Sequence, residues 1–252
     1  MTTPKPGTVA KPSAVDRPDS SRRRSMPENL ISRMDYEPQA VTEIMRIVGH
    51  LLRRGERPPR TILVTSAEAR EGKSTVAGMM AATAARYLKK RTILVDGDLR
   101  NPAVGRLMAM DDKPGLGEWL SGRSGSQPLD MRRATGLENL HVLTAGTKIA
   151  RPADVLDADA VEALVAQCAK TYDLTFIDTS PIMPVADPLI FSAAVDATVI
   201  VIKVGVTQRQ TAQRAIQLLH QAGGRVAGCV LNDVTSQLPS YYSSSYYAVT
   251  SP

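Results

Sequence analysis

The sequence predicts an α/β fold in which a doubly wound, mostly parallel β-sheet is flanked by helices. Several segments are continuous runs of Val, Ile and Leu, which suits strands that are covered on both faces. Helical stretches separate most of these runs, and alternating strands and helices are typical of a parallel sheet with crossover helices. With 252 residues and 43% hydrophobic composition, the chain is long enough for one sizeable domain of this kind.

The predicted elements also indicate where a site would lie. Predicted strands cover residues 61–65, 91–96, 140–143, 174–178, 198–204 and 226–231. Predicted helices cover residues 74–89, 160–170 and 208–221, and an amphipathic helix covers residues 38–54. Ligands of such sheets bind at the carboxyl ends of the strands, so the residues that follow strands are the first candidates for a site.

Residues 65–75, TSAEAREGKST, end like a phosphate-binding loop. That loop has Gly, four arbitrary residues and then Gly-Lys-Ser/Thr, because backbone N–H groups surround the phosphates while the lysine and the hydroxyl reach the terminal phosphate and Mg²⁺. Gly72, Lys73 and Ser74 complete the pattern, but Ala67 stands at the first Gly position. A strand before the loop and a helix after it favour an anion site, with an ordinary strand-to-helix turn as the alternative.

Acidic residues follow two further predicted strands. In RTILVDGDLRNP, Asp96 and Asp98 end a hydrophobic strand, and Arg100 follows closely. If the extended geometry persists, both carboxylates project to the same side, into the crevice; helix capping is the structural alternative. In YDLTFIDTSP, Asp178 ends another apolar strand, as does the acid that holds Mg²⁺ directly or through water in P-loop proteins. The phosphate-binding loop, the strand that ends with Asp96 and Asp98, and the strand that ends with Asp178 follow one another in this order, and together they predict a nucleotide site.

Charge is unevenly distributed along the chain. The net charge is +6, and residues 1–35 hold seven Lys or Arg against four Asp or Glu, which is half of the excess. This segment is rich in Pro, Ser and Thr and contains three consecutive arginines from Arg22 to Arg24, so we predict that it is disordered. We interpret it as a solvated linker, with contact to anionic lipid or nucleic acid as the alternative.

Membrane, disulfide and zinc signals are weak. No apolar run approaches the roughly 20 residues that span a bilayer, and the N-terminus lacks an apolar signal core, so we expect a soluble, cytoplasmic protein. Cys168 and Cys229 fall in a predicted helix and a predicted strand, so we expect two buried, reduced thiols. Three scattered histidines argue against a zinc site.

On these motifs the chain resembles the bacterial tyrosine kinases of capsule and exopolysaccharide systems, which belong to the wider deviant-Walker P-loop ATPases. The resemblance covers residues 42–234 and rests on ILVTSAEAREGKST, ILVDGDLRNP, FIDTSP and VLND. It implies a P-loop NTPase fold of the MinD/ParA type. In this family the first glycine of the loop is commonly absent, so Ala67 fits it. Relatives of the MinD/ParA type carry a signature lysine where this chain has Glu68, which argues against a positioning ATPase.

The C-terminal residues are similar to the autophosphorylation tail of that family. Four of the seven tyrosines of the chain stand within the last twelve residues, namely Tyr241, Tyr242, Tyr246 and Tyr247. We interpret them as phosphate acceptors; the alternative is an aromatic, uncharged tail that packs onto a surface groove.

The resemblance also implies roles for the site residues, with ATP and Mg²⁺ as cofactors. The phosphates would be held by Glu71, Gly72, Lys73, Ser74 and Thr75. Mg²⁺ would be held by Ser74, Asp98 and Asp178. Asp96 would take the proton of the tyrosine hydroxyl, whose pKa near 10 makes it a poor nucleophile by itself. Catalysis would also depend on Lys73, Asp98 and Arg100, and Arg100 would steady the charge that develops on the phosphate. Asn232 would read adenine.

Two positions depart from the family pattern. The loop usually reads Pro-Gly where this chain has Ala69 and Arg70, so either Arg70 adopts an unusual backbone conformation or the loop sits differently. An arginine there would also add a cation beside the phosphates. The oligomerisation helix of the family reads Glu-x-x-Arg-x-x-Arg; Glu43 and Arg46 match it, but Gly49 replaces the last arginine.

The sequence therefore predicts three parts: a disordered basic tail over residues 1–35, a kinase domain over residues 36–235 and a flexible, tyrosine-rich tail over residues 236–252. We expect an ATP-dependent protein-tyrosine autokinase that regulates exopolysaccharide or capsule polymerisation and export. Expected partners are a membrane-anchored co-polymerase that activates it and further copies of the chain for trans-phosphorylation, with no specific nucleic acid. It would lie at the inner face of the cell membrane through its partner.

Two other functions remain open at this point. One is a non-kinase ATPase that works as a switch or positioning module, and the other is an adaptor that binds nucleotide without turnover. Dinucleotide binding is disfavoured, because no Gly-x-Gly-x-x-Gly follows the first strand.

Overall fold

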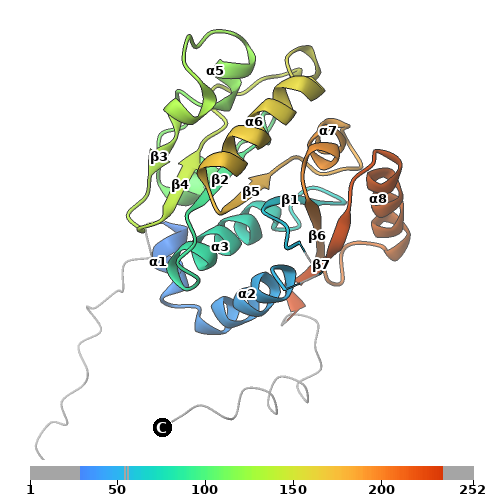
Figure 1. Cartoon of the computed structure of the whole chain (residues 1–252). Helices are drawn as coiled ribbons and strands as arrows, with labels where there is room; N and C mark the ends of the chain where they lie inside the picture. The colour runs from blue at the N-terminus through green and yellow to red at the C-terminus, as the bar shows by residue number, and fades with distance from the viewer. Residues whose placement is uncertain (1–28, 54, 56, 235–252) are drawn as a thin grey trace, which may run out of the picture.

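The protein is described by a computed structural model that covers residues 29–53, 55 and 57–234. Within these residues seven strands form one sheet in the order β3-β4-β2-β5-β1-β6-β7 (Figure 1). The strands are β1 (Thr61–Ser66), β2 (Thr92–Asp96), β3 (Arg133–Ala134), β4 (Leu140–Leu143), β5 (Leu174–Asp178), β6 (Ala197–Lys203) and β7 (Val226–Asn232). All neighbouring strands pair in parallel except β3 and β4, which are antiparallel.

Helices cover both faces of this sheet. They are α1 (Leu30–Met34), α2 (Pro38–Leu51), α3 (Lys73–Arg86), α4 (Val104–Met108), α5 (Leu116–Leu120), α6 (Ala158–Thr171), α7 (Asp187–Ala194) and α8 (Arg209–Gln221), with short 3₁₀ turns η1 (Pro128–Met131) and η2 (Pro152–Asp154). In β1, Ile62 and Val64 pack into one hydrophobic cluster with α1 to α4, whereas Leu63 packs into a second cluster with α5 to α7. This alternation is the two-residue period of a strand between two layers, and it confirms the predicted doubly wound α/β fold.

Some element boundaries differ from the prediction. The short elements α1, α4, α5 and β3 were not expected, and α7 was missed as well. The predicted tail extends to residue 35, but the structure has a packed helix before that residue. Leu30 and Met34 of α1 are buried in the hydrophobic cluster that also contains residues of α3. Five residues are too short for a strong periodic signal, so only the packing reveals this helix. Residues 1–28 and the tyrosine-rich residues 235–252 lie outside the described part of the chain.

The two cysteines are both free, as expected, but only one of them is buried. Cys168 of α6 is fully buried, and its burial raises the pKa of the thiol to about 12. Cys229 is exposed, so the prediction of a buried thiol is wrong there. The physical reason is that β7 is an edge strand with β6 as its single neighbour in the described sheet, so its outer residues lack a covering layer.

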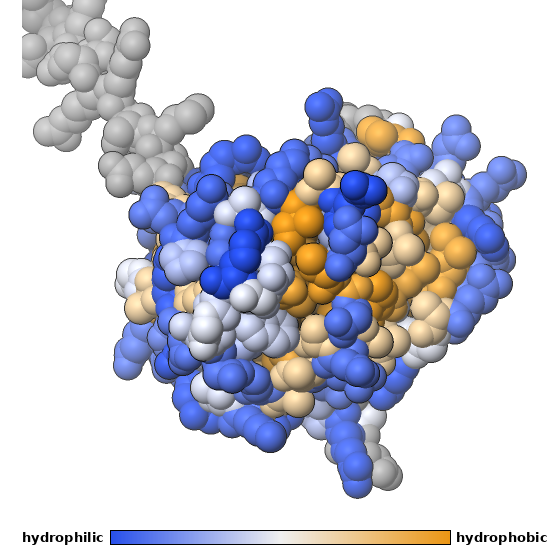
Figure 2. Space-filling model, turned by 90° about the horizontal axis from the view of Figure 1, so that it is seen from above, coloured by the Kyte–Doolittle hydropathy of each residue, from blue (hydrophilic) through white to orange (hydrophobic). Residues whose placement is uncertain are grey.

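One face of the molecule carries an apolar area among hydrophilic residues (Figure 2). On the face shown in Figure 2, hydrophobic residues gather near the centre and are surrounded by hydrophilic ones. Single exposed apolar side chains are common on proteins, whereas a continuous area is the kind of surface that binds other molecules. No helix in the described residues combines the length and the apolar character that a membrane span requires.

The sheet brings the ends of three predicted strands together. In the register of the sheet, Val64 of β1 lies beside Asp178 of β5, and Asp178 lies beside Asp96 of β2. The phosphate-binding loop follows β1 directly. The three motifs therefore meet at the carboxyl ends of the central strands, where doubly wound sheets bind ligands.

Candidate active site

The loop between β1 and α3 is a tight turn with two left-handed residues. Gly72 has φ 91°, and a Cβ atom there would lie 2.2 Å from Nδ2 of Asn232, so this position requires glycine. Arg70 has φ 66°, which is rare for a residue with a side chain. Of the two alternatives raised by the sequence, the structure has the unusual backbone conformation at Arg70.

Glu71 anchors this loop to two distant segments. It is 2% exposed, and its carboxylate accepts a hydrogen bond from the backbone N–H of Glu68 at 2.7 Å. The other carboxylate oxygen accepts from the hydroxyl of Thr207, which lies between β6 and α8. Nδ2 of Asn232 donates to the Glu71 carbonyl at 2.9 Å. The Glu71 side chain therefore shapes the loop, which leaves the backbone as the part available to a phosphate.

Lys73 lies among the acidic residues of the neighbouring strand ends. Its Nζ is 2.9 Å from Oδ2 of Asp98, 3.8 Å from Oδ1 of Asp178 and 3.2 Å from Oγ of Ser74. Burial opposes the charge of Lys73, but the carboxylates of Asp178 and Asp98 outweigh it and raise the pKa of the ammonium above its usual value. The lysine thus carries its charge at neutral pH and lies where a terminal phosphate would compete for it.

Asp98 and Asp178 differ in how well their oxygens are satisfied. Oδ1 of Asp98 accepts from the hydroxyl of Ser180 at 2.7 Å and from the backbone N–H of Asn101 at 3.0 Å. Asp178 is fully buried, and its carboxylate oxygens make no close hydrogen bond; the Lys73 ammonium lies 3.8 Å away and the Ser74 hydroxyl is nearby. Burial raises the pKa of Asp178 to about 6, although the Lys73 ammonium draws it down. A buried carboxylate without hydrogen bonds is costly, unless a cation or a ligand completes it.

These residues fit Mg²⁺. Carboxylate and hydroxyl oxygens are its usual protein ligands, and it is bound through one or two carboxylates together with waters and phosphate oxygens. Ser74, Asp98 and the unsatisfied Asp178 supply such a set at one place. In the described part of the chain no three His, Cys, Asp or Glu residues are grouped so that they could hold a metal by themselves.

Asp96 contacts different groups from its neighbour Asp98. The strand ends at Asp96, and its carboxylate accepts hydrogen bonds from the backbone N–H of Asp98 at 3.1 Å, Ala103 at 3.0 Å and Val104 at 2.9 Å. It is fully buried, and burial together with the charge of Asp178 raises its pKa to about 8. Asp96 therefore holds the start of α4 and keeps a proton more readily than an ordinary carboxyl group.

Arg100 is held by an acidic residue that the sequence did not single out. Its Nε lies 2.9 Å from Oδ2 of Asp187 at the start of α7, and its Nη2 lies 3.3 Å from Oδ1. The hydrogen bond to Asp187 raises the pKa of the guanidinium further. Asp187 is nearly buried, so this pair fixes Arg100 beside the cleft.

A cleft of about 710 Å³ opens beside the loop and is lined by most of these residues. Its lining includes Lys73, Ser74, Thr75, Asp98 and Arg100, and also Ser180 after β5. Asp96 and Asp178 lie beneath this lining, and Glu71 faces away from it. Sequence reasoning missed Ser180, Asp187 and Thr207; Ser180 stands two residues after Asp178 in FIDTSP and was the easiest to find.

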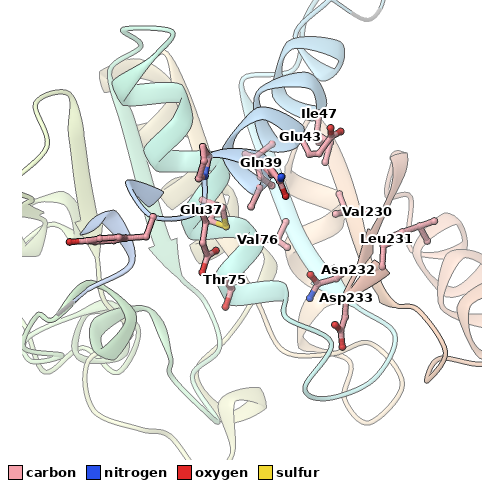
Figure 3. Close-up of a pocket in the computed structure, with 16 residues that line it drawn as sticks. Glu37, Gln39, Glu43, Ile47, Thr75, Val76, Val230, Leu231, Asn232 and Asp233 are labelled. Carbon is pink, nitrogen blue, oxygen red and sulfur yellow. The ribbon is translucent and has the colours of Figure 1, made fainter. Parts of the chain in front are cut away.

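A second pocket of about 660 Å³ lies on the other side of the loop, between α2, α3 and the end of β7. Figure 3 shows Asn232 and Asp233 at the end of β7 across from Thr75 and Val76 at the start of α3. Gln39 and Glu43 reach the same pocket from α2 (Figure 3). A base bound here would adjoin both the amide of Asn232 and the loop.

Curated proteins similar to this chain are tyrosine-protein kinases, although no family model matches it. Tyrosine-protein kinase YwqD of Bacillus subtilis (strain 168) is 31% identical over 192 residues, which cover 76% of this chain and 79% of that protein. Putative tyrosine-protein kinase CapB of Staphylococcus aureus is 31% identical over 188 residues, which cover 75% of this chain and 79% of that protein.

Solved structures of a kinase domain, of a chimerical protein and of MinD have a fold similar to that of this chain. The kinase domain of Escherichia coli tyrosine kinase ETK superposes with a TM-score of 0.75 at 24% identity, covering 84% of this chain and 83% of that domain. The chimerical protein CapA2B2 superposes with a TM-score of 0.66 at 26% identity, covering 82% of this chain and 86% of that chain. MinD of Pyrococcus horikoshii, solved with Mg-ADP, superposes with a TM-score of 0.61 at 20% identity, covering 76% of this chain and 78% of that chain. This similarity shows the shared P-loop fold.

Proposed function

Because the chain belongs to the bacterial tyrosine-protein kinases, we propose that it is an autokinase whose acceptors are the C-terminal tyrosines of other copies of the same chain. The enzyme class is a protein-tyrosine kinase, and ATP is its phosphate donor. The acceptors would be Tyr241, Tyr242, Tyr246 and Tyr247, which lie outside the described residues. Their phosphorylation would regulate the polymerisation and export of an exopolysaccharide or capsule.

The observation that carries this proposal is the group of Lys73, Asp98 and Asp178 beneath the phosphate-binding loop. Asp178 lacks a close hydrogen-bond partner, and Lys73 is charged through its acidic neighbours, so the site is ready for a phosphate and a divalent cation. The four tyrosines near the end of the same chain supply an acceptor.

Phosphate binding would divide between backbone and side chains. The loop amides from Glu71 to Thr75 would surround the phosphates, and Lys73 would turn from Asp98 toward the terminal one. Ser74, Asp98 and Asp178 would hold Mg²⁺, which neutralises charge on the phosphate oxygens. Asn232 would contact adenine in the pocket of Figure 3.

The transfer step forms a bond between the tyrosine oxygen and the terminal phosphorus, while the bond from that phosphorus to ADP breaks. The tyrosine proton would pass to Asp96, whose pKa of about 8 makes it a stronger base than an ordinary carboxylate. Asp96 itself is fully buried, and Ala103, whose backbone N–H donates to it, lines the cleft. Arg100, held by Asp187, would steady charge on the transferring group.

The similarity to tyrosine-protein kinases supports a proposal for the partners and the location. We propose a membrane-anchored polysaccharide co-polymerase as activator, contact between copies of the chain through α2, and a position at the inner face of the cell membrane. On α2, Glu43 and Arg46 pair with each other at 2.6 Å on the exposed side, where a second copy would compete for them. No specific nucleic acid is involved in this proposal.

The test is incubation of the full chain with ATP and Mg²⁺, followed by intact mass and peptide mapping. We expect phosphate on the C-terminal tyrosines, its loss in Lys73→Ala, and its retention in Lys170→Ala, which removes an exposed lysine at the end of α6. A chain that ends after Thr235 should gain no phosphate. ATP hydrolysis without phosphotyrosine, even with a candidate activator present, would favour an ATPase switch, which Arg70 in the loop makes the second candidate.

A further inference from the structure

Unpaired arginines line the cleft in front of the phosphate-binding loop. We propose that this cleft binds a phosphate group already carried by the acceptor segment, so that one phosphotyrosine in the C-terminal residues holds the next tyrosine in place. This inference rests on the proposed function, because the acceptor segment is the one named there. The ligand is a phosphate monoester on an otherwise uncharged peptide.

The cations of the cleft fall into two groups. Lys73 pairs with Asp98, and Arg100 pairs with Asp187. Arg70 and Arg106 also line the cleft, but both are exposed and neither side chain makes a hydrogen bond or ion pair with another described residue. Two guanidinium groups thus remain available in a cleft that already contains the site of transfer.

The backbone positions of both arginines are defined. Arg70 lies in the loop itself, three residues before Lys73, with the left-handed φ that turns the chain there. Arg106 belongs to α4, whose first N–H groups, from Ala103 and Val104, are bound by the carboxylate of Asp96. The arginines therefore extend from two anchored segments on either side of the cleft.

The C-terminal residues complement this arrangement only after modification. Residues 235–252 contain no Asp, Glu, Lys or Arg. A phosphate on tyrosine adds about 1.5 to 2 negative charges at neutral pH and three acceptor oxygens, and arginine binds phosphate through two parallel hydrogen bonds. An uncharged tail has nothing to pair with Arg70 and Arg106, whereas a phosphorylated one does.

The spacing of the tyrosines suits two contacts from one segment. The described chain ends at Val234, which lines the pocket on the other side of the phosphate-binding loop, where Asn232 donates to the Glu71 carbonyl. The seven residues from Val234 to Tyr241 extend at most about 25 Å. The tyrosines stand in two adjacent pairs, so a phosphotyrosine on the arginines leaves a second tyrosine on the same short segment free to enter the site.

Binding of synthetic peptides tests this directly. The protein is the full chain with Tyr241→Phe, Tyr242→Phe, Tyr246→Phe and Tyr247→Phe, which removes its own acceptors. Fluorescent peptides of residues 236–252, either unphosphorylated or phosphorylated on one of the four tyrosines, are titrated by anisotropy in saturating Mg-ADP. We expect at least one phosphopeptide to bind at least fivefold more tightly than the unphosphorylated peptide.

Matched variants identify the residues responsible. Arg106→Ala should remove most of that preference, whereas Arg214→Ala, which removes an exposed arginine from α8, should keep it. Equal affinity for all peptides in saturating Mg-ADP, or equal effects of the two variants, would overturn the inference. Absence of transfer to any peptide would instead count against the proposed function, since binding is measured separately.

Discussion

The ends of β2 and β5 carry two fully buried carboxylates that differ in their surroundings. Asp96 at the end of β2 accepts three backbone hydrogen bonds and ties the strand to α4, whereas Asp178 at the end of β5 makes no close hydrogen bond. Burial alone would assign them the same role. The hydrogen bonds distinguish a carboxylate that the fold has satisfied from one that awaits a ligand.

A large loss of phosphate transfer is expected at Asp178. Asp178→Asn should lower phosphate transfer at least about a hundredfold, because it removes a charged metal ligand at the transferring phosphate. It should not lower the free energy of unfolding of the free chain, since a buried and unsatisfied charge disappears. Transfer assays and urea denaturation measure the two effects, with Asp111→Asn at an exposed position as the control. A clear loss of stability would contradict the comparison.

Asp96→Asn should abolish transfer and also destabilise the fold. The asparagine keeps one acceptor oxygen, but its amide group faces N–H donors, so the expected cost is about 1–3 kcal/mol of unfolding free energy. ATP binding, measured by calorimetry, should remain largely intact. Retained transfer would show that Asp96 is not the base, and unchanged stability would show that its three hydrogen bonds matter little.

The same pair predicts how stability depends on pH. The folded pKa values, about 8 for Asp96 and about 6 for Asp178, lie above the ordinary value of 3.8, so folding favours the protonated forms. This contribution is complete below the ordinary pKa and is lost as pH rises through the folded values, so the stability that this pair contributes should be lost between about pH 4 and pH 8. Urea midpoints across this range should fall less steeply in Asp178→Asn. An unchanged slope in that variant would contradict the assignment.

The smallest effect is expected in the loop, away from both carboxylates. Arg70→Gly should stabilise the chain by about 1 kcal/mol, because glycine adopts φ 66° without the cost of a Cβ atom. Arg70→Ala removes the same guanidinium but keeps the Cβ atom, so it should not stabilise. Equal thermal midpoints for the two variants would show that the loop stores no such strain.

The layers of the fold and the central residues of the site could be predicted from the sequence better than the residues that hold the site in place. Continuous apolar runs identified the central strands, and the order of Gly72, Asp98 and Asp178 along the chain placed three motifs at one end of the sheet. The partners Asp187 and Thr207 were not predicted, because they lie 87 residues from Arg100 and 136 residues from Glu71 respectively. Such contacts depend on how loops pack, which no local pattern encodes. Exposure of Cys229 depends likewise on its strand being at the edge.

The central claim is that this site phosphorylates the tyrosines of another copy, and a mixing experiment tests it most directly. One copy carries Lys73→Ala with its tyrosines intact, and the other has an intact site with Phe at positions 241, 242, 246 and 247. Each alone should gain no phosphate with Mg-ATP. In the mixture, intact mass should show phosphate on the Lys73→Ala copy, and peptide mapping should place it within residues 241–247. A mixture without phosphotyrosine, under conditions in which the unaltered chain phosphorylates itself, would contradict transfer between copies.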